Sequence, residues 1–343
     1  MRIVICMPVV PFMTGGAAIL VENLRAELVK RKHTVERIGL PFKWYPPYQL
    51  IDCALAWKLS DLSESNGGKI DLVISTKYPA YVTEHPNHVT WLFHQHRPAY
   101  DLWDYPNNDL QSFKEGSYVR EKIINLDNAS FKKIKKIYTL SNTVSDRLEK
   151  YNQIKSEPLY APVPNAEKFH NKEYGDYILV PSRISPLKRQ DLLVEAMQYV
   201  KNDVKCKIVG FDAHKKWLKE KLGSNNKKIE LLTDVNDNEL IDLYSKALAV
   251  VFIPYEEDYG FITLEAFISK KPVLTATDSG GPLEFVKNEE NGCVVDPDPK
   301  QIAKALDKFY DDKEKTKKMG ENGFQTYKKL NLNWDHVIDK LIK

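Results

Sequence analysis

Two acidic residues in one segment are spaced so that they could contact different parts of a single ligand. Glu257 follows the apolar run 249–254, which we expect to be a buried strand, and Glu265 lies in the opening turn of an expected helix over 262–269. A helix dipole favours a carboxylate in the first turn, where Glu265 could accept hydrogen bonds from a ribose diol. Glu257, in the loop, could accept hydrogen bonds from sugar hydroxyls, and Gly260 would let the backbone approach a ligand closely.

Cationic residues follow the first expected strand of the C-terminal half, 177–181. Arg183 and Lys188 lie in a loop that leads into a helix, so together they could bind a diphosphate, the arginine in bidentate fashion. Such charges can stabilise a leaving diphosphate, as a metal ion does in other enzymes. For these two residues taken alone, a surface pair without function is the alternative.

Glycine turns follow two further expected strands. Thr14, Gly15 and Gly16 lie between strand 3–7 and helix 17–31, where the N–H groups of a helix N-terminus could contact an anion. The GxGxxG fingerprint of dinucleotide-binding domains is absent, and an ordinary strand-to-helix turn explains this motif equally well. Gly280 and Gly281 follow strand 272–275 and turn toward the same sheet edge as Glu257.

Titratable residues also end the expected strand 89–93 of the N-terminal half. His94, His96 and Arg97 could contact a phosphate or a sugar hydroxyl there. An exposed loop without function is the alternative. A zinc site is disfavoured, because only two ligands are evident.

The elements that must position these residues alternate between strands and helices in both halves, which predicts two doubly wound α/β domains. Their ligands would bind beyond the carboxyl ends of the strands, so that two facing domains would share a cleft. Two prolines in 160–165 indicate a stiff connector. The remaining expected strands are 71–75, 137–141, 206–210 and 229–232, and the remaining expected helices are 189–200, 237–246, 299–310 and 334–342.

Composition excludes several classes of protein. The 343 residues suggest two domains, and a net charge of +3 is too small to indicate a nucleic-acid partner. The longest apolar run, 247–254, is far below the ~20 residues of a membrane span. Four scattered cysteines and no signal peptide predict a reducing, cytoplasmic location. Lysine clusters at 132–136 and 313–318 favour solvated helix faces, with attraction to anionic lipid headgroups or to a phosphate-bearing substrate as the alternative.

The segment 257–265 resembles the E-x7-E signature of the retaining glycosyltransferases of family 4, which have the two-domain GT-B fold. Other landmarks of that family occur in the same order along nearly the whole chain. They are the glycine turn at 15–16, a histidine at a strand end, the Arg183 and Lys188 pair, the Gly-Gly-x-x-Glu turn at 280–284, and Asn291-Gly292.

The resemblance implies a role for each matching residue. Arg183 and Lys188 would bind the donor diphosphate, Glu257 the transferred sugar, and Glu265 the ribose. His94 would lie beside the reacting sugar, with His96 as the second choice. Further donor-site residues would be Gly15, Gly16, Tyr259, Gly260, Phe261 and Ile262, followed by Arg97, Thr263 and Gly281.

Two positions depart from the family pattern. Ser182 stands where the family usually has a glycine before the arginine, which bears on how closely the backbone can approach a phosphate. The turn Gly210-Phe211-Asp212 is less glycine-rich than usual. Neither change removes a charged group.

The implied domains are an acceptor-side domain, 1–165 together with about 326–343, and a donor-binding domain, 166–325. The aromatic loop 42–48 would be packing, or a contact for the acceptor or a membrane surface.

The implied function is retaining transfer of a sugar from a UDP- or GDP-sugar to a glycan or lipid-linked acceptor. It would serve cell-surface polysaccharide or glycolipid biosynthesis, without metal or cofactor and without nucleic acid. The enzyme would act in the cytoplasm, with peripheral association at the inner face of the membrane. A GT-B sugar-nucleotide epimerase and a non-catalytic nucleotide-sugar-binding protein are the alternatives.

Overall fold

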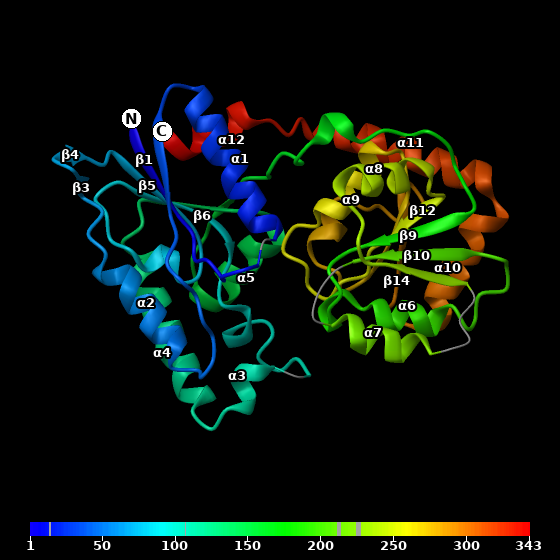
Figure 1. Ribbon diagram of the computed structural model, residues 1–343, viewed down its shortest axis with the longest axis horizontal. Coiled ribbons are helices and arrows are strands. Elements are labelled where there is room, and N and C mark those ends of the chain that lie inside the picture. The colour runs from blue at the N-terminus through cyan, green and yellow to red at the C-terminus, as the bar shows by residue number, and fades with distance from the viewer. Residues whose placement is uncertain (14, 107, 211–213, 224–227) are drawn as a thin grey trace. The chain divides into compact units, whose positions relative to one another are not determined.

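The chain folds into two compact units (Figure 1). The computed structural model describes residues 1–13, 15–106, 108–210, 214–223 and 228–343. Unit 1 consists of Met1–Pro164 and Leu332–Lys343, and unit 2 consists of Asn165–Asn331. The boundary expected near 326 falls inside helix α11 (Lys313–Leu330), so the chain returns to unit 1 only after that helix ends.

A parallel sheet forms the centre of unit 1, with strand order β2-β1-β5-β6-β7-β8. The order reverses direction between β1 and β5, as in doubly wound folds. The strands are β1 (Arg2–Cys6), β2 (Thr34–Ile38), β5 (Leu72–Lys77), β6 (His88–His94), β7 (Lys136–Thr139) and β8 (Glu157–Pro158). A short antiparallel pair, β3 (Glu64–Ser65) with β4 (Gly68–Lys69), stands apart from this sheet.

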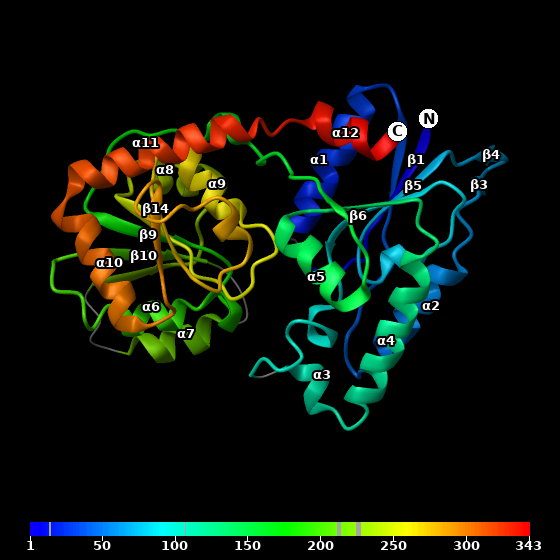
Figure 2. The same cartoon turned by 180° about the vertical axis from the view of Figure 1, so that it is seen from behind.

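Helices cover this sheet on both faces, which explains why the central strands β1, β5 and β6 are almost entirely buried. Helices α1 (Gly16–Lys30) and α12 (Trp334–Ile342) lie side by side near the two termini in Figures 1 and 2. Helix α12 buries Val337, Ile338 and Leu341, which ties the end of the chain to unit 1. The remaining helices are α2 (Gln49–Leu59), η1 (Ala80–Val82), η2 (Arg97–Ala99), α3 (Asp109–Ser112), α4 (Gly116–Phe131) and α5 (Asn142–Asn152).

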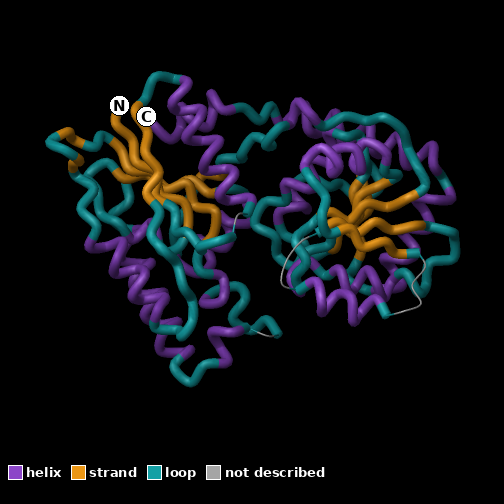
Figure 3. The backbone as a smooth tube through the Cα atoms, in the orientation of Figure 1, coloured by secondary structure: helices purple, strands orange, loops and turns teal. Residues whose placement is uncertain are grey.

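Unit 2 repeats the plan, with a parallel sheet of order β11-β10-β9-β12-β13-β14 between two layers of helices (Figure 3). The strands are β9 (Tyr177–Pro181), β10 (Lys205–Val209), β11 (Ile229–Leu232), β12 (Ala249–Val251), β13 (Val273–Ala276) and β14 (Gly292–Val295). The α-helices besides α11 are α6 (Gln190–Ala196), α7 (Lys215–Leu222), α8 (Asp237–Lys246), α9 (Phe261–Ile268) and α10 (Pro299–Asp311). The short helices are η3 (Ala166–Lys168), η4 (Pro186–Lys188) and η5 (Gly281–Glu284). The predicted fold class, two doubly wound α/β domains, is confirmed.

Candidate functional site

The strand order of unit 2 brings three loops together. It reverses between β9 and β12, and β13 pairs with the far side of β12. All three strands are parallel, so the loops that follow them leave from neighbouring points on the carboxyl edge of the sheet, where doubly wound folds bind ligands. The loop after β9 carries Arg183 and Lys188, the loop after β12 carries Glu257, and the loop after β13 carries Gly280 and Gly281.

The loop after β9 is held in shape by one buried amide. The Nε2 group of Gln190 donates to the hydroxyl of Ser182 at 2.6 Å and to the carbonyl of Arg183 at 2.9 Å. The Arg183 side chain is exposed, whereas only 16% of the Lys188 side chain is exposed. The hydroxyl of Ser185, in the same loop, is buried and has no hydrogen-bond partner among the described residues.

Lys188 and Glu257, two of the predicted site residues, contact each other directly. The Lys188 ammonium donates to the carboxylate of Glu257, and it also lies 5.3 Å from the centre of the Phe252 ring. Both side chains of this ion pair are largely buried. The pair therefore places one cation and one carboxylate, each able to bind a polar ligand, at the reversal point of the sheet.

The glycines at 280 and 281 let the loop after β13 pack against the Glu257 loop. The N–H of Glu257 donates to the carbonyl of Ser279 at 2.9 Å, and the N–H of Gly281 donates to the carbonyl of Glu257 at 2.7 Å. Gly280 has φ 67°, and a Cβ atom on Gly281 would lie 2.5 Å from the carbonyl oxygen of Tyr259. Packing between the two loops is therefore sufficient to explain why glycine occupies positions 280 and 281.

Gly260 starts helix α9 and fixes the position of Glu265. Its φ of 90° belongs to the left-handed region, so α9 begins at Phe261 and Glu265 is its fifth residue. The prediction that Glu265 lies in the first turn is therefore wrong, and the helix dipole is not what stabilises its charge. The hydroxyl of Tyr244 donates to Glu265 Oε2 at 2.7 Å, and burial raises the pKa of Glu265 to about 6.

The side chains of two other predicted residues point into the protein. The Tyr259 ring is 2% exposed and packs edge-on against the rings of Phe261 and Phe285. Thr263 is fully buried. Any ligand contact by these two residues would have to be made by the backbone. Phe261 and Ile262 are the first two residues of α9, and N–H groups at this position in a helix have no intrahelical partner.

In unit 1, the two candidate histidines have different surroundings. His94 ends β6, and its Nδ1 lies 2.6 Å from the carbonyl oxygen of Gln95. The His96 ring packs against the rings of Tyr78 and Phe42, with centroids 5.4 Å and 6.4 Å away. Burial lowers the pKa of His96 to about 3, so its imidazole is neutral at ordinary pH.

Arg97 belongs to a largely buried ion-pair network. Its Nε and Nη2 atoms donate to Asp101 Oδ2 at 2.9 Å and 2.7 Å, and Arg147 approaches the other oxygen of Asp101 at 3.3 Å. The segment is therefore not the exposed loop considered as an alternative, and Arg97 helps to fix its conformation.

The fold does not require glycine at positions 15 and 16. Gly15 precedes α1 with φ −134°, which other residues adopt freely, and a Cβ atom on either glycine would meet nothing within 4 Å. Thr14 of the same motif lies outside the described residues, as do Phe211 and Asp212 of the turn after β10.

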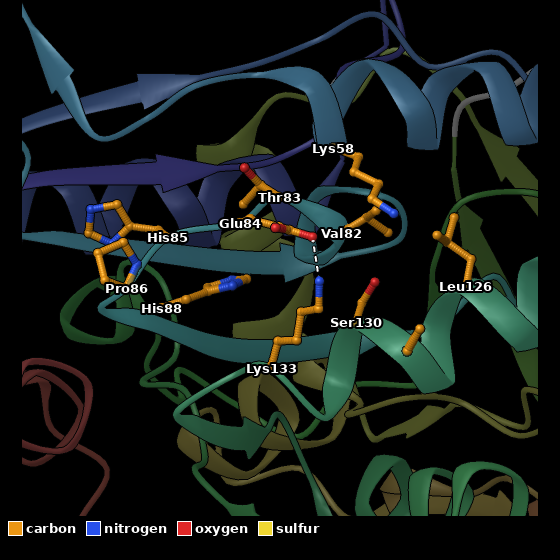
Figure 4. A pocket seen from close by; sticks show the side chains of 11 residues that line it. Lys58, Val82, Thr83, Glu84, His85, Pro86, His88, Leu126, Ser130 and Lys133 are labelled. Carbon is orange, nitrogen blue, oxygen red and sulfur yellow. Dashed lines mark hydrogen bonds and ion pairs between the residues drawn. The ribbon is translucent and has the colours of Figure 1, made fainter.

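A pocket of about 340 Å³ in unit 1 contains none of the predicted site residues (Figure 4). It lies beside the amino end of β6 and is lined by His88, Lys58, Glu84 and Lys133, among others. Lys133 donates to Glu84 at 2.8 Å, as the dashed line shows. The pocket is thus at the sheet edge opposite to the one where His94 ends β6.

Sequence reasoning missed several residues around the site, among them Gln190, Tyr244, Arg189 and Asp278. Arg189 directly follows Lys188, and Asp278 lies two residues after β13, which are signals that could have been used. Tyr244 lies in α8, and no motif marks it. Within the described ranges, no three His, Cys, Asp or Glu side chains are grouped as metal ligands would be. In the same part of the chain, no helix is both long and apolar enough to cross a bilayer.

Comparison with known proteins connects this geometry to a family. Residues 164–326, nearly all of unit 2, match the family model described as glycosyl transferases group 1. An α-1,3/1,6-mannosyltransferase, ALG2, of Dictyostelium discoideum is 32% identical over 137 residues, or 37% of this chain and 32% of the relative. A poly(ribitol-phosphate) α-N-acetylglucosaminyltransferase of Staphylococcus aureus is 30% identical over 191 residues, or 50% of this chain and 38% of the relative. The chain thus spans about a third of the length of these curated relatives.

A solved structure shares the fold over almost the whole chain. HepE from Anabaena, in complex with UDP-glucose, superposes with a TM-score of 0.71 at 15% identity, covering 99% of this chain and 98% of HepE. Two doubly wound units with their site residues at carboxyl strand ends define the GT-B fold of glycosyltransferases. Residues 164–326 are thus similar to the group 1 glycosyl transferases, and the chain as a whole shares the GT-B fold.

Proposed function

We propose that this protein is a retaining glycosyltransferase of family 4 that moves a sugar from a nucleotide-diphosphate sugar to a glycan or lipid-linked acceptor. The observation that supports this most is the meeting of Lys188 and Glu257 at the reversal point of the unit 2 sheet. A cation for a diphosphate and a carboxylate for a sugar stand side by side there, at the edge where such sheets bind ligands.

In the proposed complex, Lys188 and Arg183 bind the diphosphate, and their charges stabilise it as it leaves. Glu257 exchanges its contact with Lys188 for hydroxyls of the transferred sugar. Glu265, oriented by the hydroxyl of Tyr244, accepts from the ribose diol. The N–H groups at the start of α9 face the sugar and the phosphates.

The relatives support the substrate class. HepE has been solved with UDP-glucose, and the two curated relatives are named as transferases of mannose and of N-acetylglucosamine. The donor in this proposal is a UDP- or GDP-sugar. Because the positive charge at the diphosphate comes from Arg183 and Lys188, transfer requires no metal ion.

Unit 1 is the proposed acceptor side. His94 is the better candidate for the residue beside the reacting sugar, because His96 is packed among aromatic rings. Gly15 and Gly16 border the site, and the aromatic loop 42–48 contacts the acceptor or a membrane surface. Tyr45 and Tyr48 of this loop are more than half exposed. The pathway we propose is polysaccharide or glycolipid synthesis at the cytoplasmic face of a membrane.

The test is a thermal-shift screen of UDP, GDP and their sugars, followed by transfer assays with the donor that binds. A ligand that binds the native state raises the melting temperature. We expect one base to be preferred, transfer to survive EDTA, and the product to keep the anomeric configuration of the donor by NMR. Inversion, or activity that EDTA abolishes and a divalent ion restores, would contradict the mechanism. Epimerisation without an acceptor, or binding without turnover, would favour the alternative classes.

A further inference from the structure

Two residues outside the predicted donor contacts join the loops of the donor edge. Arg189 donates from Nη1 to Asp278 Oδ1 at 2.7 Å and from Nη2 to Asp278 Oδ2 at 2.6 Å. Its guanidinium also lies 5.0 Å from the centre of the Tyr255 ring. The side chains of Arg189 and Asp278 are only 15% and 31% exposed. This bidentate geometry is the most directional form of ion pair in proteins.

The backbone places this pair directly beside Lys188 and Glu257. Arg189 is the next residue after Lys188, and the carbonyl of Asp278 accepts from the N–H of Glu256, next to Glu257, at 2.9 Å. The N–H of Tyr255 donates to the carbonyl of Leu187 at 2.8 Å. The pair therefore connects the loop after β9 to the loops after β12 and β13.

The backbone at Arg189 indicates that its side chain is needed. Its φ of 54° and ψ of 37° lie in the left-handed region, which is unfavourable for a non-glycine residue. Glycine would adopt this conformation without that cost. The ion pair with Asp278 and the contact with Tyr255 explain why an arginine is found here.

We propose that Arg189 and Asp278 are positioning residues for donor binding, and we call them the 189–278 clamp. The clamp fixes the loop that carries Lys188 relative to the loop that carries Glu257, so that the ammonium is already in place when a diphosphate binds. This inference depends on the proposed function of Lys188 as a diphosphate ligand. Glu265 is held by Tyr244 from a different helix, so the ribose contact does not depend on the clamp.

A specific signature follows from this division of roles. Loss of the clamp weakens the contact to the diphosphate and does not change the contact to the ribose. The affinity for a nucleoside diphosphate therefore falls more than the affinity for the monophosphate. A clamp that served only stability would lower the melting temperature and leave the ratio of the two affinities unchanged.

The experiment is calorimetric titration of the full chain with UDP, UMP, GDP and GMP. The variants are Arg189→Ala, Arg189→Lys, Asp278→Asn and the exchanged pair Arg189→Asp/Asp278→Arg. Lys205→Ala is the control, because it removes a more exposed ion pair, with Asp176, at the amino end of β10. Circular dichroism and melting temperature show that each variant is folded.

We expect Arg189→Ala and Asp278→Asn to weaken the preferred diphosphate roughly tenfold, and the monophosphate by much less, as for a lost charge-assisted contact. The exchanged pair should recover part of the loss, and Lys205→Ala should bind like the wild type. If the wild type binds no nucleotide, the proposed function fails and the clamp with it. If the wild type binds and the folded clamp variants keep its ratio of diphosphate to monophosphate affinity, only the clamp is wrong.

Discussion

At the scale of single residues, the proposed ribose contact of Glu265 implies that donor binding depends on pH. Burial raises the pKa of this carboxyl to about 6, and the Tyr244 hydroxyl occupies one of its oxygens. A ribose diol donates both of its protons best to an ionised carboxylate. Binding should therefore favour the charged form and weaken as the pH falls through about 6.

The first prediction concerns the affinity for the intact nucleotide sugar between pH 5 and pH 8. Both phosphates of this ligand are esterified, so they do not titrate in this range. Below pH 6 we expect the wild-type affinity to fall with the pH, and the slope should approach about tenfold per pH unit. Glu265→Gln should bind weakly at pH 8, with little further change at pH 5. Glu257→Gln is the matched control and should keep the wild-type slope. Equal slopes in wild type and Glu265→Gln would exclude Glu265 as the ribose ligand.

Among the site residues, those in loops directly after parallel strands could be placed from the sequence. Lys188 follows β9 and Glu257 follows β12. Because these two strands are neighbours in the sheet, the two side chains contact each other. Their direct ion pair was not predicted, because each was assigned to a ligand. Glu265 is the fifth residue of α9 instead of the fourth residue of the expected helix, because α9 begins directly after the left-handed Gly260. This dihedral angle cannot be predicted from the sequence, because glycine adopts positive and negative φ values about equally readily.

At the scale of elements, the two glycine turns serve different purposes. In unit 2, a Cβ on Gly281 would lie 2.5 Å from the carbonyl of Tyr259, so this glycine is required by the packing of two loops. In unit 1, Gly15 has an ordinary φ and open space around its Cα. We therefore propose that the glycine at position 15 serves the close approach of a ligand.

The second prediction compares Gly281→Ala with Gly15→Ala. Gly281→Ala should lower the free energy of unfolding by about 1–3 kcal/mol, as overpacking does. Gly15→Ala should change it by less than about 0.5 kcal/mol while lowering kcat/KM for transfer. Urea unfolding and initial rates measure the two effects. Normal kinetics in Gly15→Ala would remove the glycine turn from the site, and an unchanged stability of Gly281→Ala would contradict the loop packing.

Helix α4 carries a buried acid that links it to η1 and to Tyr100, which directly follows η2. Asp127 is fully buried, and its Oδ2 accepts from the hydroxyls of Tyr81 at 2.8 Å and Tyr100 at 2.7 Å. Its Oδ1 has no partner among the described residues. Burial raises the pKa of Asp127 to about 7. The folded protein therefore keeps a proton that the unfolded chain loses near pH 4.

The third prediction follows from this difference in bound protons. Between pH 4 and pH 7 the folded state binds more protons at Asp127 than the unfolded state does, so the free energy of unfolding of unit 1 should fall as the pH rises. Asp127→Asn keeps an oxygen that can accept from both tyrosines, and its side chain cannot ionise. Its free energy of unfolding should therefore not show this decline with rising pH. Urea unfolding at pH 5 and pH 8 tests it, with the exposed Glu121→Gln on the same helix as control. Parallel pH profiles for wild type and Asp127→Asn would refute the argument.

Elements with a regular pattern could be predicted closely, and those shaped by tertiary packing could not. Strand β11 and helices α8 and α12 have the expected bounds. Only the start of helix α11 was predicted, as a solvated helix face at 313–318, and its remaining length, which contains Gly320 and Gly323, was not. Those glycines lie against Lys270 and Phe267, where a Cβ would come within 2.0 Å and 2.5 Å of their atoms. Close packing of this helix on α9 therefore outweighs its weak intrinsic propensity.

At the scale of the whole molecule, the chain forms two units of the same plan from one continuous sequence. The return to unit 1 occurs at Leu332, after α11. Helix α12 is then fixed by the capping bond from His336 N–H to the Asn333 side chain and by its buried apolar face. The edge-on contact of Trp334 with Trp91 adds to this packing. The repeated alternation of strands and helices predicts this division, whereas the point of return depends on the length of α11.

The central claim, that the carboxyl edge of the unit 2 sheet binds a nucleotide sugar through Lys188, is tested most directly by calorimetric titration with the preferred nucleoside diphosphate. The account predicts saturable binding to the wild type. It also predicts a loss of about 1.5–3 kcal/mol in Lys188→Ala, the range for a hydrogen bond to a charged group, with no loss in Lys205→Ala. Affinity in folded Lys188→Ala equal to that of the wild type would contradict it.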